Sequence, residues 1–206
     1  MIPYKTASDD YELTEPPKDK FKRLRSERQP LYLTSEELDE ILGWKLRGQY
    51  ERQKEKRKAN TEDVIRTVTG AALSITHPDE DYETELRLRL LCCIRGVGIR
   101  VASAVLALVF PAKYATIDFR GWRQIFGEEK KEFSISDYKC YLREIKQLAA
   151  ESGWLPQEVD LAIWAKDVAE SRSQHAGVAS NRAQEDYRET LGEGPGGSMG
   201  GVWQVH

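Results

Sequence analysis

The strongest constraint on the fold is an apolar segment that follows a short glycine-containing turn. After residues 96–98, apolar side chains occupy nearly every position from Ile99 to Val109, with Arg100 and Ser103 as the polar exceptions. A helix that is apolar on almost all sides has to be surrounded by other elements. The segment therefore predicts a central buried helix, and the rest of the chain has to supply the elements that cover it.

Apolar residues recur at helical spacing through most of the remaining chain, and capping residues precede these stretches. Thr34-x-x-Glu37 has the pattern of a capping box, and Asp118 is placed to cap a helix over 119–126. The expected helices cover about 35–57, 61 to Pro78, 79–94, 99–109, 119–126, 135–151 and 156–170. No useful stretch alternates apolar and polar residues as a strand does. We therefore predict an all-α fold, a compact bundle of about six to eight helices.

Composition changes divide the chain into three parts. Residues 1–30 contain four of the eight prolines and few apolar residues, which predicts an extended arm with basic residues. The periodic segments predict one helical domain over 31–171. Residues 172–206 hold few aliphatic residues and a run rich in glycine, so we predict a disordered tail.

The net charge of −3 conceals an uneven distribution. Residues 18–58 carry 13 Lys and Arg against eight acids, and residues 95–123 carry five against Asp118 alone. Local cationic excess of this kind is typical of a surface that binds nucleic-acid phosphates. For the run over 45–58, a solvated helix face is the alternative, because its glutamates stand three or four residues from lysines and arginines.

Cysteines and hydropathy limit the class of protein further. Cys92, Cys93 and Cys140 are too few for a disulfide framework and lack the spacing of a zinc site. We expect free thiols in a reducing compartment, hence an intracellular protein in the cytoplasm, nucleoid or nucleus. No stretch approaches the roughly 18–20 apolar residues of a membrane span, and no signal segment is recognisable at the start. We predict no metal ligands and no cofactor.

The Gly96-Val97-Gly98 turn is the first candidate site. Glycine permits φ > 0 and lets a partner approach the backbone closely. The turn also directs the first N–H groups of the following helix outward, where they can bind an anion such as a DNA phosphate. A plain turn between two helices is the alternative explanation for this tripeptide.

The context of the turn resembles a known family. Ile94-x-Gly96-Val97-Gly98-x-x-x-Ala102 is similar to the hairpin of the helix–hairpin–helix (HhH-GPD) base-excision DNA glycosylases, the endonuclease III-like superfamily. Members carry an aspartate about twenty residues beyond the second hairpin glycine, and Asp118 stands 20 residues beyond Gly98. Arg123 and the preceding Trp122 also match the family. The similarity is close over 85–126 and looser elsewhere.

The resemblance implies a helix–hairpin–helix motif, binding to double-stranded DNA and a catalytic role for Asp118. A carboxylate beside the deoxyribose would stabilise the oxocarbenium-like charge that develops when the N-glycosidic bond breaks. The DNA-binding residues it implies are Gly96, Val97, Gly98, Arg100, Arg120 and Arg123.

One departure from the family defines the expected reaction. Bifunctional members carry a lysine two residues after the second hairpin glycine, where Arg100 stands here. Arginine stays protonated and cannot act as an amine nucleophile. The resemblance therefore implies a monofunctional glycosylase without strand cleavage, unless Lys45 or Lys113 reaches the site. The cysteines of the iron–sulfur cluster are absent, so no cluster is expected.

Three functions remain open at this point. The first is a glycosylase that acts as a monomer on a modified base. The second is a non-catalytic DNA-binding module in which Asp118 only caps a helix. The third is an all-α interaction protein in which the glycine turn has no ligand.

Overall fold

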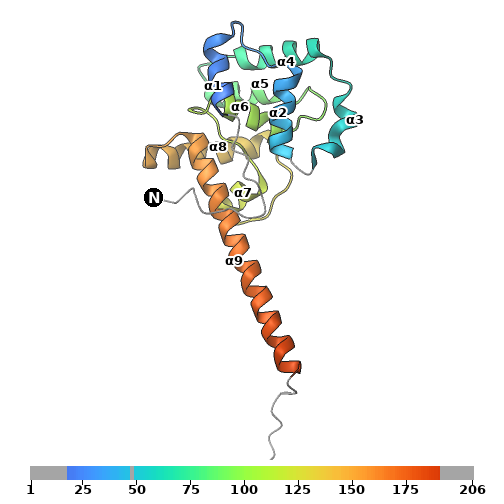
Figure 1. The fold of residues 1–206 in the computed structure, drawn as a ribbon. Helices are drawn as coiled ribbons and strands as arrows, with labels where there is room; N and C mark the ends of the chain where they lie inside the picture. The colour runs from blue at the N-terminus through green and yellow to red at the C-terminus, as the bar shows by residue number, and fades with distance from the viewer. Residues whose placement is uncertain (1–17, 47–48, 191–206) are drawn as a thin grey trace, which may run out of the picture. The chain divides into compact units, whose positions relative to one another are not determined.

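The computed structural model describes residues 18–46 and 49–190, and within these ranges the chain forms nine α-helices and no strand (Figure 1). The predicted all-α class is confirmed. The helices are α1 (Lys18–Glu27), α2 (Ser35–Leu46), α3 (Lys54–Arg57), α4 (Glu62–Ser74), α5 (Glu80–Leu91), α6 (Ile99–Val109), α7 (Phe119–Phe126), α8 (Ile135–Ser152) and α9 (Pro156–Thr190). A short 3-10 helix, Glu51–Gln53, precedes α3.

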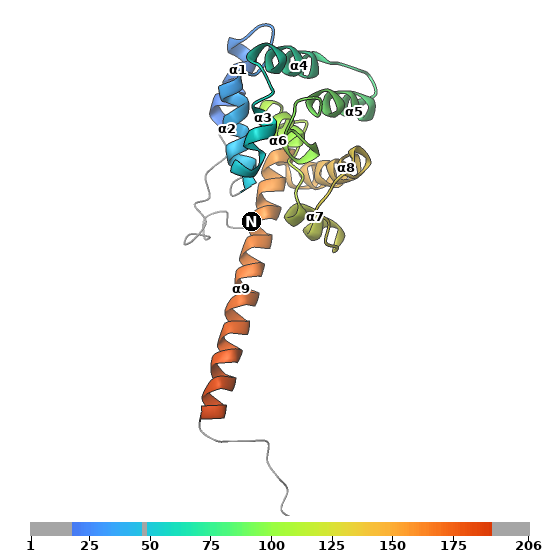
Figure 2. The same ribbon diagram turned by 90° about the vertical axis from the view of Figure 1, so that its right-hand side faces the viewer.

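Helix α6 lies at the centre of the bundle, in contact with α1, α2, α5 and α8 (Figures 1 and 2). Every residue from Val101 to Val109 is buried, Ser103 included. The prediction of a central apolar helix is confirmed. Burying so much apolar surface on one element is the main reason that the surrounding helices pack together.

The helix ends follow the capping residues of the sequence. The Thr34 hydroxyl accepts from the Glu37 N–H at 3.2 Å while the Glu37 carboxylate accepts from the Thr34 N–H at 2.9 Å, which is the predicted capping box. Ser134 and Asp137 form a second capping box at α8, and Gly153 ends that helix in the left-handed region with φ 72°.

Helix α1 contradicts the prediction of an extended arm over 1–30, whose first 17 residues lie outside the described ranges. Phe21 and Leu24 are buried in the core, and one helical turn separates them. Arg28 then donates to the Glu37 carboxylate at 2.7 and 3.0 Å, which ties the end of α1 to α2. A second ion pair joins Lys20 of α1 to Glu40 of α2. Buried apolar side chains and ion pairs therefore dock a segment whose composition predicts an extended arm.

The helix predicted over 35–57 is divided in the structure. Helix α2 ends at Leu46, and α3 begins at Lys54 after the 3-10 helix. All four residues of α3 lie outside the buried core. The basic run therefore forms a separate short element beside the bundle, a change that the helical periodicity did not reveal.

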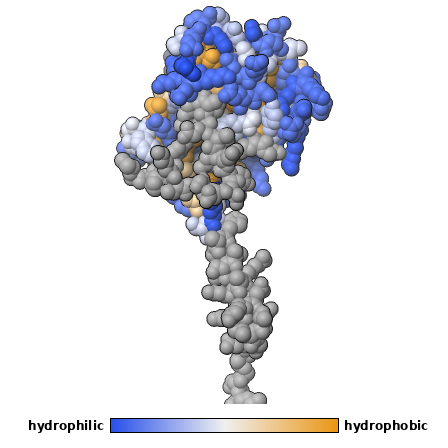
Figure 3. Space-filling view, in the orientation of Figure 1, coloured by the Kyte–Doolittle hydropathy of each residue, from blue (hydrophilic) through white to orange (hydrophobic). Residues whose placement is uncertain are grey.

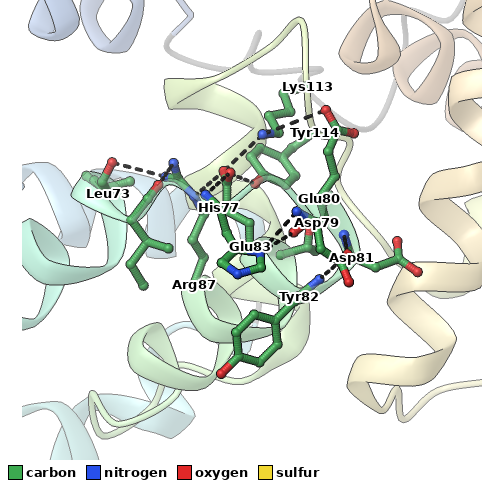
Figure 4. Close-up of polar contacts among 12 residues, drawn as sticks. Leu73, His77, Asp79, Glu80, Asp81, Tyr82, Glu83, Arg87, Lys113 and Tyr114 are labelled. Carbon is green, nitrogen blue, oxygen red and sulfur yellow. Dashed lines mark hydrogen bonds and ion pairs between the residues drawn. The ribbon is translucent and has the colours of Figure 1, made fainter.

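A buried glutamate joins α5 to its neighbours (Figure 4). The Glu83 carboxylate accepts from Arg87 Nε at 2.9 Å, Lys113 Nζ at 3.0 Å, the His77 N–H at 3.1 Å and the Tyr114 hydroxyl at 3.2 Å. Arg87 also donates to two backbone carbonyls at the end of α4. Because the carboxylate has four donors, we assign this network to packing rather than catalysis.

Helix α9 extends beyond the expected end near 170, reaching Thr190. Residues 172–190 are therefore helical, which contradicts the predicted disorder there, and 191–206 lie outside the described residues. The chain divides into two compact units, Met1–Asp167 and Val168–His206, so α9 contributes its first part to the larger unit. The larger unit also contains α1, unlike the predicted domain over 31–171. None of the described helices is long and apolar enough to cross a membrane.

Candidate functional site

Asp118 begins α7, as its position in the sequence predicts. Its backbone is extended, and its Oδ1 accepts hydrogen bonds from the N–H groups of Arg120 and Gly121, both at 3.0 Å. Such a cap satisfies N–H groups that have no partner within the helix. The cap uses one carboxylate oxygen and leaves Oδ2 for another partner.

That partner is Lys45, which comes from α2. The Lys45 Nζ lies 3.2 Å from Asp118 Oδ2, and the side chains are 7% and 16% exposed. Of the two lysines named as possible substitutes for the missing hairpin amine, Lys45 therefore reaches Asp118. Lys113 does not, because its Nζ contacts Glu83.

The ion pair and the helix cap keep Asp118 ionised. Burial by itself raises the pKa of this carboxyl group, but the Lys45 charge and the N–H groups of Gly121 and Arg120 outweigh it, so the pKa lies below its usual value. A carboxylate in this state can stabilise positive charge or orient a water molecule.

A second buried acid lies nearby, Asp160 on α9, which the sequence pattern did not single out. The Tyr141 hydroxyl donates to its Oδ1 at 2.7 Å, and the Thr116 N–H donates to its Oδ2 at 3.3 Å. Burial and then the charge of Asp118 raise the pKa of Asp160 to about 7, although Lys45 opposes them. The available signal was one acid flanked by two apolar residues, Val159 and Leu161.

Gly121 connects the cap of α7 with this second acid. A Cβ atom at Gly121 would lie 2.4 Å from the Tyr141 hydroxyl oxygen. Only glycine therefore permits the tyrosine to lie against the first turn of α7 while it donates to Asp160. Asp118, Lys45, Tyr141 and Asp160 consequently belong to one polar cluster inside the larger unit.

Ser103 links the Asp118 segment to the helix that follows the glycine turn. Its hydroxyl donates to the Arg100 carbonyl at 2.9 Å and accepts from the Ile117 N–H at 3.1 Å. Ile117 directly precedes Asp118, and Arg100 is the second residue of α6. The structure thus brings the two halves of the family-like pattern together through one buried hydroxyl group.

The three residues of the glycine turn have different environments. Gly96 has φ 87°, Val97 is buried in the core, and Gly98 is exposed with no atom within 4 Å of the place a Cβ would occupy. Arg100 is partly buried, and its Nε has no hydrogen-bond partner among the described residues. Only the backbone at Gly98 therefore offers an unobstructed approach.

Arg120 and Arg123, two predicted DNA contacts, both bind Asp167 of α9. Arg120 Nη1 lies 2.6 Å from Asp167 Oδ2, and Arg123 donates to both carboxylate oxygens at 2.9 and 2.7 Å. Asp167 is 1% exposed. Burial would raise its pKa, but these arginines and Gln124 lower it. Both arginines therefore hold α7 to α9, and their contact with DNA stays a prediction.

Catalysis by Asp118 requires that a substrate reach its carboxylate, which is only 16% exposed and is paired with Lys45. A substrate would have to displace Lys45 from Asp118 or contact both side chains.

No three His, Cys, Asp or Glu side chains of the described residues gather as ligands for a metal ion. Comparison of the chain with protein-family models, curated proteins and solved structures finds no match. The glycosylase resemblance therefore rests on the residues of this chain alone.

Proposed function

We propose that this protein is a DNA glycosylase that binds duplex DNA at the Gly96–Gly98 turn and uses Asp118 to hydrolyse the N-glycosidic bond of a modified base. The observation that supports it is the Lys45–Asp118 pair. A helix cap needs only an oxygen acceptor, and a buried ion pair adds little stability for its desolvation cost. A lysine held 3.2 Å from the capping carboxylate therefore favours a chemical role.

The proposed reaction uses Asp118 in its ionised state. The target base first leaves the duplex stack, which costs a few kcal/mol and least for a damaged or mispaired base. As the glycosidic bond breaks, the base departs with the bonding electrons and the sugar becomes oxocarbenium-like. Asp118 stabilises this charge and orients the water that attacks C1′, so the products are a free base and an intact abasic strand.

Lys45 supports a second candidate activity. If the Lys45 amine gives up a proton and attacks C1′ in place of water, the bond from C1′ to the base breaks and the base leaves with the bonding electrons. The C1′–O4′ bond then breaks, O4′ takes up a proton from the nitrogen, and an imine forms between Lys45 and the ring-opened sugar. Borohydride would reduce this imine to a stable protein–DNA adduct. Formation of this adduct with borohydride therefore distinguishes attack by the amine from attack by water. If the amine is the nucleophile, Lys45→Met should abolish the adduct.

A non-catalytic DNA-binding module is the alternative that the low exposure of Asp118 and its ion pair with Lys45 favour. In that case Asp118 is a helix cap and its contact with Lys45 is structural. For both the glycosylase and the DNA-binding module, we propose that the protein is a monomer and binds DNA inside the cell.

The test is a panel of duplexes, each with a different base lesion, incubated with the protein and then treated with alkali. We expect alkali-labile sites with at least one lesion, and a loss of about a hundredfold or more in Asp118→Asn. Asp79→Asn is the matched control, because Asp79 caps α5 through the N–H groups of Asp81 and Tyr82 in the same way. It should keep full activity.

Other outcomes would favour the remaining functions. Duplex binding without product on any lesion would favour the binding module. Equal activity in Asp118→Asn and Asp79→Asn would mean that Asp118 is only a cap. Duplex affinity that does not change with salt would exclude phosphate binding and leave a protein-interaction role.

A further inference from the structure

The short basic helix α3 lies beside the glycine turn, although the two are about 40 residues apart in sequence. Asn60 Nδ2 donates to the Arg95 carbonyl at 2.8 Å, and the Arg95 N–H donates back to Asn60 Oδ1 at 3.0 Å. A Cβ atom at Gly96 would lie 3.1 Å from Arg57 Cγ. The end of α3 therefore contacts the residues that begin the turn.

Arg57 holds α3 in this position. Its guanidinium lies 3.9 Å from the centre of the Tyr50 ring and donates to the Tyr50 carbonyl at 2.6 Å. It also pairs with Asp39 of α2 at 3.7 Å, and the Tyr50 hydroxyl donates to the same aspartate. Because Arg57 is only 10% exposed, it supports the surface rather than forming its charge.

The exposed charge comes from the residues around Arg57. Residues 51–58 contain five cations and two acids, and residues 92–100 contain Arg95 and Arg100 without any acid. Arg52, Lys56 and Arg95 are exposed, and no carboxylate of the described residues pairs with them. Figure 3 has the orientation of Figure 1, and the edge of the surface at the position of α3 is blue there, the colour of hydrophilic residues.

We infer that the 3-10 helix, α3 and the glycine turn form one cationic surface for the sugar–phosphate backbone of duplex DNA. In this surface Arg52 of the 3-10 helix and Lys56 of α3 each neutralise a phosphate outside the reach of the turn. This inference rests on the proposed function for the identity of the partner. The surface binds without regard to base sequence, since lysine and arginine on phosphates position DNA but do not read it. Its role is to hold the duplex while the turn and Asp118 act.

The experiment measures the affinity of the full chain for an undamaged duplex over a salt series. Removing one cation that binds a phosphate lowers the slope of log K against log salt by about 0.9. We expect Arg52→Gln/Lys56→Gln to reduce the slope by between about 1 and 2, without a change in the helical circular-dichroism signal. Lys22→Gln/Arg143→Gln is the matched control, since it removes two exposed cations from α1 and α8. Its slope should equal that of the wild type.

Ethylation of single phosphates adds an independent measurement. We expect some ethylated phosphates to weaken binding by the wild type and the control while leaving binding by Arg52→Gln/Lys56→Gln unaffected. An unchanged slope in the double variant, or an equal decrease in the control, would overturn the inference and leave the glycosylase proposal intact. A decreased slope in a protein that excises no base would support the surface and overturn the catalytic proposal. No duplex binding by the wild type would overturn both.

Discussion

At the scale of single residues, the Lys45–Asp118 pair makes a prediction about stability that is separate from catalysis. Asparagine at 118 has one carbonyl oxygen, which can cap α7 or face Lys45 but cannot do both. Because an uncompensated buried charge is costly, Asp118→Asn should reduce the free energy of unfolding by up to about 3–5 kcal/mol. Lys45→Met should cost less, since two N–H groups still bind the carboxylate. Urea denaturation measures both.

The double variant Lys45→Met/Asp118→Asn provides the control for that experiment. It removes both charges, so it should be more stable than Asp118→Asn alone. Additive losses from the two single variants would contradict an energetic coupling between the side chains. The same double variant also gives a folded protein without the proposed catalytic carboxylate.

Asp160 predicts a pH dependence of stability. Its pKa is about 7 in the folded protein, against about 3.9 for an unfolded aspartate. Between pH about 4 and 7 the unfolded chain releases this proton first, so the free energy of unfolding falls as the pH rises. At about 1.4 kcal/mol for each pKa unit, the total loss amounts to a few kcal/mol. Asp160→Asn should remove this pH dependence of the free energy of unfolding.

The measurement is urea denaturation of wild type and Asp160→Asn from pH 4 to pH 8. The free energy of unfolding of Asp160→Asn minus that of the wild type should increase between pH about 4 and 7 and become constant above pH about 7. Asp63→Asn, which changes an exposed aspartate of α4, controls for the loss of one acid. A constant difference between Asp160→Asn and wild type across the window would contradict the elevated pKa.

At the scale of elements, the two glycines of the turn have different roles. Gly96 has φ 87° and lies against Arg57, so Gly96→Ala should destabilise the protein by about 1–2 kcal/mol. Gly98 has φ −105° and open space where a Cβ would lie, so Gly98→Ala should melt close to the wild type. If DNA approaches this backbone, Gly98→Ala should nevertheless weaken duplex binding. Thermal melts and binding at one salt concentration separate these effects.

Two results would contradict these roles of the glycines. Wild-type duplex affinity in Gly98→Ala would mean that no DNA backbone comes close to this glycine. A normal melting temperature in Gly96→Ala would mean that the turn can rearrange without cost. The turn would then be a connection between α5 and α6 and nothing more.

At the scale of the whole molecule, stability should reside in the larger of the two units. Nearly all buried apolar side chains that the structure describes up to Ser173 lie in this unit, and Val168 is the exception. We expect a chain ending at Ser173 to change the free energy of unfolding by less than about 1 kcal/mol, because the deleted residues belong to the other unit. Its duplex affinity should equal that of the full chain.

Thermal denaturation and the salt series test this truncation. A protein that ends at Ser173 and melts without a cooperative transition would show that the second unit is needed for folding. A lower slope against salt would place phosphate contacts beyond residue 173 and move part of the DNA surface there.

The local features of this protein were determined by its sequence. The capping residues Thr34 and Asp118 lie at the helix starts that they predict, and α6 is buried because its own residues are apolar on almost all sides. Capping and periodicity depend on residues within one or two turns of helix, which is why a single chain reveals them. The short-range pattern around the glycine turn also singles out Asp118.

Only the tertiary structure decided what surrounds those features. Asp118 contacts Lys45 across 73 positions of sequence, and the Arg95–Asn60 hydrogen bonds bring α3 to the turn. Asp160 became an elevated-pKa acid, and Arg123 became a support for α9, through packing alone. Such pairs depend on how helices are arranged in space, and no periodicity along the chain records that arrangement. The elements could therefore be predicted, while the partners of their charged side chains could not.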